Sequence, residues 1–160
     1  QPLGLNDSQV QVAIPYYNPV TKKKIRYSFL ISKAGLLIDE LPTLNDVFPT
    51  FDKRWRHIRV YGSFCWQYVT RETYVQSDSD LDILIPYLNQ TLDSIDMAIR
   101  DIKFKSKLTV DGEVRFPTFG DCAIHELLNY KSQTILFKST YSVALVPREI
   151  VYANFPALFY

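Results

Sequence analysis

Two aspartates separated by one residue, Asp80 and Asp82, lie at the start of an apolar run that ends at Ile85. In a β-strand, residues i and i+2 point to the same face, so a strand here brings the two carboxylates together. Neighbouring carboxylates repel each other unless a cation lies between them, and their oxygens are ligands that Mg²⁺ prefers. The spacing therefore predicts that Asp80 and Asp82 hold a divalent metal ion. The alternative is two charges at the edge of a strand.

A glycine and a serine, Gly62 and Ser63, follow the short apolar segment 57–61 and precede a predicted helix over 64–70. Backbone N–H groups are free at the start of a helix, and the helix dipole makes that end positive, so both features favour a bound phosphate. Glycine also allows the backbone to approach a ligand closely. A phosphate cradle facing a metal-binding carboxylate pair is the equipment of phosphoryl or nucleotidyl transfer.

A third carboxylate is expected from the alternating segment 108–116, in which Asp111 and Glu113 share the polar face. Two-metal sites commonly use a third acid on a neighbouring strand. We assign Asp111 as the third metal ligand or general base and keep Glu113 as the alternative. The competing interpretation is structural, because Asp111 followed by Gly112 is also a strong signal for a tight hairpin turn.

The spacing of apolar residues alternates between the periods of strands and helices. Strands are expected at residues 10–17, 25–32, 57–61, 81–85, 108–116, 134–138 and 142–146. Helices are expected at 41–48, at 64–70, for about 13 residues after an N-cap at Asn89 or Thr91, and at 121–130. The tail, 147–160, has no clear period and is expected to fold back over apolar surface. This order predicts an α+β protein, or an α/β sandwich, with a mixed sheet and packed helices.

The chain has 160 residues, of which 47% are hydrophobic, and this is enough for one domain with a proper core. No apolar run approaches the roughly 18–20 residues needed to cross a bilayer, and residues 1–10 lack the regions of a signal peptide. We therefore expect a cytoplasmic protein without a membrane partner. Because the chain does not begin with Met, we expect a processed or trimmed piece. Residues 1–50 are expected to be an N-terminal hairpin and lead-in region, and residues 51–160 the catalytic domain.

The number of cysteines and the distribution of charge limit the kinds of protein and substrate that fit this sequence. Cys65 and Cys122 are too few for a disulfide framework, and we expect both to be buried small hydrophobic residues in a reducing compartment. The net charge of +1 argues against a general nucleic-acid binder, so no nucleic acid is expected. Residues 21–60 nevertheless hold nine basic and four acidic residues, a net of +5, and residues 72–101 hold seven acidic residues and one basic, a net of −6. A basic flank beside an acidic metal centre suits an anionic, multiply phosphorylated substrate, although Lys22, Lys23 and Lys24 are expected to be ordinary surface.

Gly62 and Ser63 followed by Asp80 and Asp82 resemble the signature of the nucleotidyltransferase superfamily that includes DNA polymerase β. The wider context resembles the phosphoribosyl-dephospho-CoA transferases, the carrier-protein synthases of malonate decarboxylase systems. That likeness covers most of the chain, is strongest over 57–140 and rests on these residues: PLGL (2–5), VYGS (60–63), WQYVT (66–70), Tyr74, Val75, SDLD (79–82), VDGE (110–113), Pro117, Gly120, Glu126, Leu127, Leu136 and Lys138. The chain departs from the family pattern at Arg71, where glycine is usual, and at Ile124 and His125, where Trp-Arg is usual.

The resemblance implies a polymerase-β-like nucleotidyltransferase fold and an enzyme, a holo-acyl-carrier-protein synthase. The donor would be triphosphoribosyl-dephospho-CoA, the acceptor a serine of the apo acyl-carrier subunit of malonate decarboxylase, and pyrophosphate would leave. Mg²⁺ would be the cofactor, with Asp80, Asp82 and Asp111 as its ligands and as the catalytic residues. Gly62 and Ser63 would bind the pyrophosphate end, with Ser63 as a phosphate ligand and not the nucleophile.

The remaining roles follow from this hypothesis. Asp111 would accept the proton of the incoming serine. Gln67 contacts the donor or a neighbouring loop, and Lys138 is a candidate phosphate partner, unless it is an exposed surface lysine. The basic segment 53–59 is a plausible docking surface for an acidic carrier protein. The alternatives are a generic Mg²⁺-dependent nucleotidyltransferase that acts on another protein, RNA or a small molecule, and a non-catalytic nucleotide-binding relative.

Overall fold

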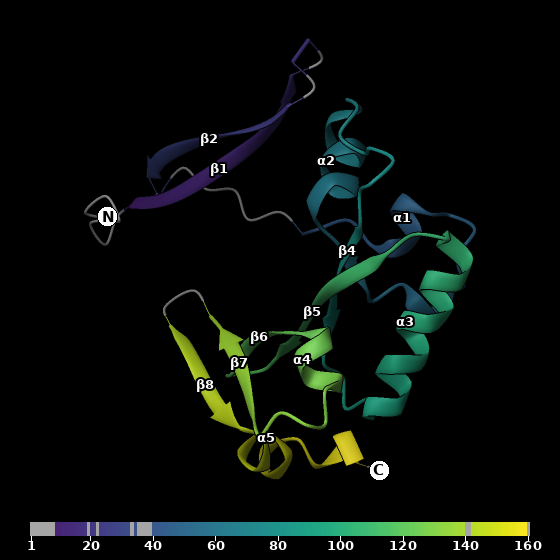
Figure 1. Cartoon of the computed structure of the whole chain (residues 1–160), viewed down its shortest axis with the longest axis vertical. Helices are drawn as coiled ribbons and strands as arrows, with labels where there is room; N and C mark the ends of the chain where they lie inside the picture. Colours follow the sequence, from purple (N-terminus) through teal and green to yellow (C-terminus); the bar gives the residue numbers. More distant parts are fainter. Residues whose placement is uncertain are drawn as a thin grey trace. The chain divides into compact units, whose positions relative to one another are not determined.

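The structure, a computed structural model, describes residues 9–18, 20–21, 23–32, 34, 40–139 and 142–159. The chain divides into two compact units, Gln1–Glu40 and Leu41–Tyr160, and each is described by itself (Figure 1). The family resemblance at residues 2–5 and the basic residue Lys22 lie outside the described residues.

The smaller unit contains an antiparallel hairpin of β1 (Gln9–Asn18) and β2 (Lys23–Ser32), which confirms both strands expected there. Asn18 begins the turn, since its side-chain Oδ1 accepts hydrogen bonds from the backbone N–H groups of Val20 and Thr21 at 2.9 and 3.0 Å. Bonding of this kind between a short side chain and the nearby backbone is what favours Asn in turns. The rings of Tyr16 and Tyr27 lie 6.3 Å apart on one face of the hairpin.

The described part of the larger unit is built on a six-stranded sheet with the strand order β3-β4-β5-β6-β7-β8 (Figure 1). The pair β4–β5 is parallel and the other pairs are antiparallel, so the sheet is mixed. With its packed helices, this sheet confirms the expected α+β class and is consistent with a nucleotidyltransferase-like fold. In chain order the strands are β3 (Arg59–Val60), β4 (Leu81–Pro86), β5 (Val110–Phe116), β6 (Gly120–Ala123), β7 (Thr134–Lys138) and β8 (Val143–Pro147).

Helical segments connect these strands: α1 (Leu44–Val47), η2 (Lys53–Trp55), α2 (Gly62–Thr70), α3 (Leu92–Ser106), α4 (Ile124–Leu128), α5 (Arg148–Asn154) and η3 (Pro156–Phe159). The longest, α3, is the amphipathic helix that the apolar spacing predicts. Of the two expected N-caps the structure uses Thr91, whose hydroxyl oxygen accepts a hydrogen bond from the Ser94 N–H at 3.0 Å. Leu92, Ile95 and Ile102 of α3 are buried in the core.

The two faces of the sheet differ in chemistry. One face carries the core, with side chains that expose at most 2% of their surface: Leu81, Ile83, Ile85, Val114, Phe116, Cys122, Ile135 and Phe137. Strand register brings a set of polar side chains onto the other face: Asp82, Asp111, Glu113, Arg115, Asp121 and Lys138. The alternation expected for 108–116 is therefore confirmed, and the predicted carboxylates of β4 and β5 lie on the polar face.

The expected helix over 121–130 is wrong in its first part. Residues 120–123 form β6, where Asp121 pairs with Arg115 of β5, and α4 begins only at Ile124. The reason is tertiary pairing, because Arg115 donates two hydrogen bonds to the Asp121 carboxylate at 2.7 and 2.8 Å while Cys122 is buried in the core. These contacts override the helical preference of the local sequence.

Two other segments show how the ends of the larger unit pack. The expected domain boundary lies between residues 50 and 51, whereas the structure divides the chain after Glu40. Residues 41–50 join the larger unit because Leu44 is fully buried and its N–H donates to the Ile58 carbonyl oxygen at 2.8 Å. The tail folds back over apolar surface as expected, but it does so as helices, with Val151 of α5 and Leu158 of η3 buried.

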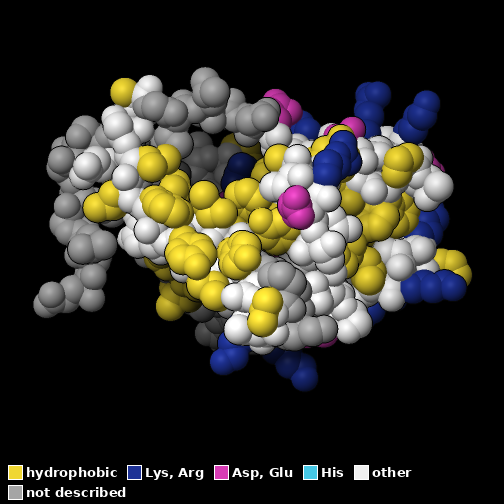
Figure 2. Space-filling model, turned by 90° about the horizontal axis from the view of Figure 1, so that it is seen from above, with side chains coloured by type: hydrophobic (Ala, Val, Ile, Leu, Met, Phe, Trp, Pro, Cys, Tyr) yellow, Lys and Arg dark blue, Asp and Glu magenta, His cyan; other side chains and the backbone are white. Residues whose placement is uncertain are grey.

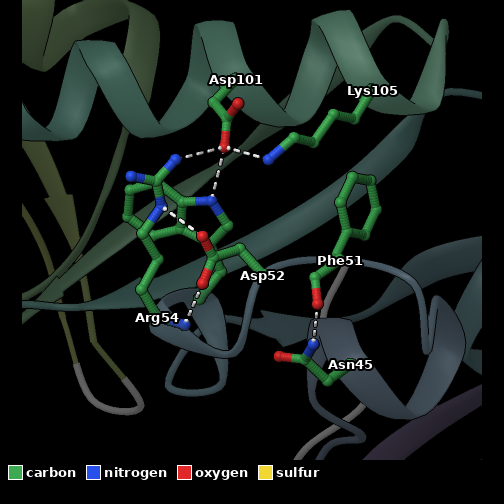
Figure 3. Close-up of polar contacts among 7 residues, drawn as sticks. Asn45, Phe51, Asp52, Arg54, Asp101 and Lys105 are labelled. Atoms are coloured by element: carbon green, nitrogen blue, oxygen red, sulfur yellow. Dashed lines mark hydrogen bonds and ion pairs between the residues drawn. The ribbon is translucent and has the colours of Figure 1, made fainter.

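A polar cluster joins η2 to α3 (Figure 3). Asp101 Oδ2 accepts hydrogen bonds from Trp55 Nε1 at 2.8 Å, Arg54 Nη2 at 3.0 Å and Lys105 Nζ at 3.0 Å. The hydrogen bond from Trp55 does most to lower the pKa of Asp101 to about 2, and that from Lys105 adds to it. The cluster fixes the segment that leads into β3 against α3.

Several basic side chains are exposed on the surface. On the face shown in Figure 2, Lys and Arg side chains stand out from the molecule and few Asp or Glu side chains are visible. In the basic segment 53–59, Lys53, Arg54 and Arg56 are exposed, whereas Arg59 is partly buried and donates to the Leu41 carbonyl oxygen at 3.2 Å. This segment therefore presents basic side chains to solvent.

The two cysteines form no disulfide with each other. Both cysteines are free, Cys122 is fully buried, and Cys65 is partly buried. Burial raises the pKa of the Cys122 thiol to about 12, so this side chain acts as a small hydrophobic residue. Within the described ranges, no helix combines the length and the apolar character needed to cross a membrane.

Candidate active site

Gly62 and Asp82 meet where β3 lies beside β4. Helix α2 follows β3 at once, and Gly62 is its first residue, with a φ of +63°. The Tyr61 N–H donates to the Asp82 carbonyl oxygen at 3.0 Å, which fixes the start of α2 against β4. A Cβ atom added at Gly62 would lie 1.9 Å from Asp82 Oδ2. The fold therefore brings the predicted phosphate turn directly against one of the predicted metal carboxylates.

Asp111 lies opposite Asp82 on the parallel strands β4 and β5. Paired residues on neighbouring strands share a face, so both carboxylates project to the polar side of the sheet. Asp111 and Gly112 lie inside β5, so the hairpin-turn interpretation of this pair is wrong. Gly112 is needed for close approach of the strands, since a Cβ atom there would lie 2.0 Å from the Ile83 carbonyl oxygen.

Asp80 is the one of the three predicted carboxylates that lies outside a strand. It is exposed and immediately precedes β4, whereas Asp82 lies within the strand and is partly buried. Leu81, between them, is fully buried and donates its N–H to the Thr109 carbonyl oxygen at 2.8 Å. The position of Asp80 therefore depends on the loop that precedes the strand.

The donor set fits Mg²⁺ only if a substrate phosphate shares the ion. In the part of the chain that the structure describes, no three His, Cys, Asp or Glu side chains converge closely enough to hold a metal. Mg²⁺ seldom uses such a cage, because it is commonly bound by one or two carboxylates together with substrate phosphates and water. Asp82 and Asp111 offer hard oxygen ligands from adjacent strands, and the absence of a Cβ atom at Gly62 lets the Asp82 carboxylate lie against the start of α2. The set of Asp80, Asp82 and Asp111 stays a prediction.

The pKa of the Tyr61 phenol is raised in part by the negative charge of this site. Its side chain is partly buried, and burial is the main cause that raises the pKa of its phenol. The negative charges of nearby carboxylates raise that pKa further: Glu113, Asp82, Asp111 and Asp121. Carboxylates from β4, β5 and β6 therefore act on one point beside the start of α2, and a cation bound there would relieve their mutual repulsion. The sequence contains no sign that Tyr61 lies near these carboxylates, apart from its position directly before Gly62.

Two ion pairs continue the polar face across the sheet. Lys138 Nζ lies 3.2 Å from Glu113 Oε1, which links β7 to β5. Arg115 and Asp121 form the second pair, with Arg115 Nε 2.7 Å from Asp121 Oδ1. The ion pair of Lys138 with Glu113 joins two predicted site residues. Glu113 is the alternative third carboxylate, and Lys138 is the predicted phosphate partner.

Ser63 and Gln67 occupy different parts of α2. Ser63 is partly buried in the first turn, where backbone N–H groups lack partners within the helix. Gln67 lies one turn further along, and its Oε1 accepts hydrogen bonds from the backbone N–H groups of Tyr74 and Val75. Of the two contacts expected for Gln67, the structure therefore contains the one with a neighbouring loop.

Glu126 is a residue whose role sequence reasoning missed. Its Oε2 accepts a hydrogen bond from the Leu136 N–H at 2.9 Å. The described pairing of β6 with β7 ends at Cys122 and Phe137, so this carboxylate continues the ladder where the strand has become α4. The spacing of Glu126 from Leu136 gave no local signal, because the contact depends on the turn between α4 and β7.

Comparison with known proteins identifies the family to which this chain is similar. A sequence model described as "Phosphoribosyl-dephospho-CoA transferase MdcG C-terminal domain" matches residues 34–149. A curated phosphoribosyl-dephospho-CoA transferase of Xanthomonas axonopodis pv. citri (strain 306) is 35% identical over 104 residues. That match covers 63% of this chain and 46% of the relative, so the chain spans less than half the length of the curated relative. No solved structure matches the chain significantly.

The matched region contains the residues that the fold brings together on the polar face and at the start of α2. It also contains Asp80 and the loop that leads to it. The family match covers well over half of the 160 residues, and the chain therefore belongs to the family of the phosphoribosyl-dephospho-CoA transferase MdcG C-terminal domain.

Proposed function

We propose that this chain transfers the phosphoribosyl-dephospho-CoA group from triphosphoribosyl-dephospho-CoA to a serine of the malonate decarboxylase acyl-carrier subunit. Pyrophosphate is the second product. Both the family and the curated relative are named for the transferred group, which supports the donor class. The observation that carries the proposal is the contact of Gly62 with Asp82, since a phosphate at the start of α2 would lie beside a metal-binding carboxylate.

The start of α2 would bind the outer two phosphates of the donor. The first turn of a helix has four N–H groups without partners in the helix, and its dipole favours negative charge. Gly62 allows the Asp82 carboxylate to lie against the first residue of α2, because a Cβ atom there would clash with Asp82 Oδ2, so a phosphate bound at the helix start would lie beside that carboxylate. The Ser63 hydroxyl would add a hydrogen bond to the same phosphates, so Ser63 acts as a ligand and not as the nucleophile.

The reaction forms one phosphorus–oxygen bond and breaks another. The acceptor serine oxygen attacks the innermost phosphorus of the donor's triphosphate group. The bond between that phosphorus and the oxygen that bridges it to the outer two phosphates breaks. The outer phosphates leave together as pyrophosphate, and Asp111 accepts the serine proton. The position of Asp111 opposite Asp82 supports this role, whereas Glu113 already lies 3.2 Å from Lys138.

Asp80, Asp82 and Asp111 would hold Mg²⁺. When bound, the ion would neutralise charge on the donor phosphates and stabilise the attacking and leaving oxygens. Phosphoryl transfer depends on positioning and charge neutralisation more than on covalent catalysis, and a site of carboxylates and backbone N–H groups suits that chemistry. Lys138 would exchange its contact with Glu113 for one with a donor phosphate.

The acceptor would dock on the basic segment 53–59. Carrier proteins are typically acidic, and complementary charge guides such encounters. Lys53 and Arg56 are exposed, while Arg54 is also bonded to Asp101. The proposal therefore places the docking function mainly on Lys53 and Arg56.

The test is a direct transfer assay. The protein is incubated with Mg²⁺, triphosphoribosyl-dephospho-CoA and the apo carrier subunit, and the carrier is then weighed by intact mass spectrometry. The expected result is a mass increase of one prosthetic group. Asp80→Asn should slow this transfer at least about 100-fold, because removing one charge-stabilising group commonly costs that much. Circular dichroism and thermal unfolding of the variant should match the wild type.

The outcomes separate the competing activities. Transfer from other nucleotide donors, without transfer from the dephospho-CoA derivative, would identify a generic nucleotidyltransferase. If neither class of donor reacts, binding without catalysis becomes the better assignment. Near-normal transfer by Asp80→Asn would contradict the metal role of that residue.

A further inference from the structure

The loop between α2 and β4, residues 71–80, connects the two halves of the proposed site. It follows the helix that begins at Gly62, and its last residue is Asp80. Asp82 lies inside β4, which pairs with β3 on one side and β5 on the other. Asp80 precedes the strand, so the path of the loop decides where its carboxylate lies.

Gln67 of α2 holds the middle of this loop. Its side-chain Oε1 accepts one hydrogen bond from the Val75 N–H at 3.1 Å and a second from the Tyr74 N–H at 3.3 Å. Two N–H donors require an acceptor, so they orient the Gln67 amide with its oxygen toward the loop. The ring of Tyr74 also lies 6.2 Å from the ring of Trp66, the preceding residue of the helix.

A tight turn carries this restraint to Asp80. The Gln76 N–H donates to Ser79 Oγ at 2.9 Å, and the Ser79 N–H donates to the Gln76 carbonyl oxygen at 3.1 Å. Ser79 is only 8% exposed, so the turn is anchored against the protein. Asp80 therefore lies between a turn fixed at Ser79 and a strand that begins at Leu81.

We propose that Gln67 is a positioning residue that sets the place of the Asp80 carboxylate by holding the backbone at Tyr74 and Val75. The same helix would then present phosphate-binding N–H groups at its start and, one turn later, fix the loop that delivers Asp80. This inference rests on the proposed function for its kinetic consequences. It assigns Gln67 to the loop and not to direct contact with the donor.

Amide hydrogen exchange tests the contact without any substrate. In Gln67→Met, which keeps the length of the side chain and removes the acceptor, the amides of Tyr74 and Val75 should exchange at least about 5-fold faster. Gln67→Glu keeps an acceptor oxygen, so exchange at both amides should stay near the wild-type rate. The control is Gln133→Met, the same change at an exposed residue outside the loop, which should leave both amides unchanged.

Kinetics then distinguish positioning from direct donor binding. For Gln67→Met we expect kcat to fall at least about 10-fold and the Mg²⁺ concentration for half-maximal rate to rise at least about 5-fold, with donor KM changed less than about 3-fold. Gln67→Glu should restore all three values to within about 3-fold of the wild type. A rise of donor KM alone would make Gln67 a donor ligand and overturn the proposal. Unchanged turnover despite faster exchange would overturn it as well.

Failure of the proposed function can be told apart from failure of this inference. If the wild type transfers no prosthetic group, the function is wrong, and Mn²⁺ binding in the presence of pyrophosphate, measured by electron paramagnetic resonance, replaces the kinetic readout. Weaker Mn²⁺ binding in Gln67→Met than in Gln67→Glu would then still support the positioning role. Equal binding in the two variants would refute it.

Discussion

Gly62 lies so close to the Asp82 carboxylate that a methyl group at residue 62 would fall 1.9 Å from Oδ2. The two residues are twenty positions apart, and the pairing of β3 with β4 brings them together. Gly62 also has a φ of +63°, a backbone conformation that residues other than glycine rarely adopt. This position therefore requires glycine for two independent reasons, one steric and one conformational.

Gly62→Ala should consequently lower both stability and turnover. The left-handed conformation and the contact with the carboxylate should together cost at least about 2 kcal/mol of unfolding free energy. Displacement of the Asp82 carboxylate should reduce kcat at least about 100-fold. Denaturant unfolding and the carrier mass assay measure the two effects. In the double variant with Asp82→Ala, about 1 kcal/mol or more of stability should return without activity, and purely additive losses would disprove the contact.

Asp111→Asn and Glu113→Gln test which acid is the third carboxylate. Asp111 lies opposite Asp82, so Asp111→Asn should reduce kcat at least about 100-fold. Glu113 lies 3.2 Å from Lys138, so Glu113→Gln should cost less than about 10-fold and act mainly through that lysine. Steady-state rates of both variants at saturating Mg²⁺ decide between them. The reverse order would transfer the role to Glu113.

Much of the fold follows from local patterns, because burial and period agree there. In β4, Leu81 and Ile83 are fully buried while Asp82 faces the other side, as alternation requires. The N-cap of α3 is similarly local, since Thr91 bonds Ser94 three residues away. Asp111 and Glu113 could be placed on one face for the same reason, because buried and more exposed side chains alternate along β5.

The elements that sequence reasoning missed depend on distant contacts. Helix α5 begins at Arg148, whose guanidinium donates hydrogen bonds to groups far away in sequence: the carbonyl oxygens of Glu126, Leu127, Asn129 and Ser132. The spacing of apolar residues over 147–160 does not reveal these partners, because they lie outside that segment. The ion pair of Glu113 with Lys138 is hidden for the same reason, since it needs the assembled sheet.

Arg56→Glu tests the acceptor surface. Arg56 is exposed, so reversing its charge should raise the carrier KM about 5-fold at low salt and leave kcat nearly unchanged. Arg54 is less suitable, because its contact with Asp101 also supports the fold. Lys131→Glu, a reversal at an exposed lysine outside the segment, is the control and should leave the carrier KM unchanged. Equal effects of the two variants would point to net charge and not to a docking site.

Asp101 should make stability depend on pH. Its pKa of about 2 in the folded protein is below the ordinary value of 3.8, so its contribution is complete above about pH 4 and is lost as pH falls toward 2. Asp101→Asn should cost about 1 kcal/mol at pH 7, allowing for solvent around its partners, and the difference should shrink below about pH 4. Urea unfolding at several pH values between 7 and 3 measures it. The control is Asp96→Asn, which should change the unfolding free energy little at any of these pH values, because the Arg100 partner of Asp96 is 79% exposed. An Asp101→Asn effect that stays constant down to pH 3 would contradict the lowered pKa of Asp101.

Arg71 stands where the family resemblance leads us to expect glycine, and its backbone conformation is one that glycine adopts most easily. Arg71 is the C-cap of α2 with a φ of +63°, and its N–H donates to the Gln67 carbonyl oxygen at 3.0 Å. Helices commonly end in this left-handed conformation, which glycine adopts without steric cost. The guanidinium of Arg71 lies over the Tyr68 ring, 4.8 Å from its centroid, and this contact offsets part of the strain.

Arg71→Gly should therefore stabilise the protein, although by less than the full relief of strain. The left-handed conformation costs an arginine about 1 kcal/mol, and the exposed contact with Tyr68 returns about 0.5 kcal/mol, so the expected net gain is about 0.5 kcal/mol. Lys107→Gly is the matched variant, because Lys107 is the C-cap of α3 with a φ of +59°. No ring contact of Lys107 is found among the described residues, so its gain should approach about 1 kcal/mol. Denaturant unfolding of both variants measures the difference, and a larger gain for Arg71→Gly than for Lys107→Gly would show that the contact with Tyr68 contributes nothing.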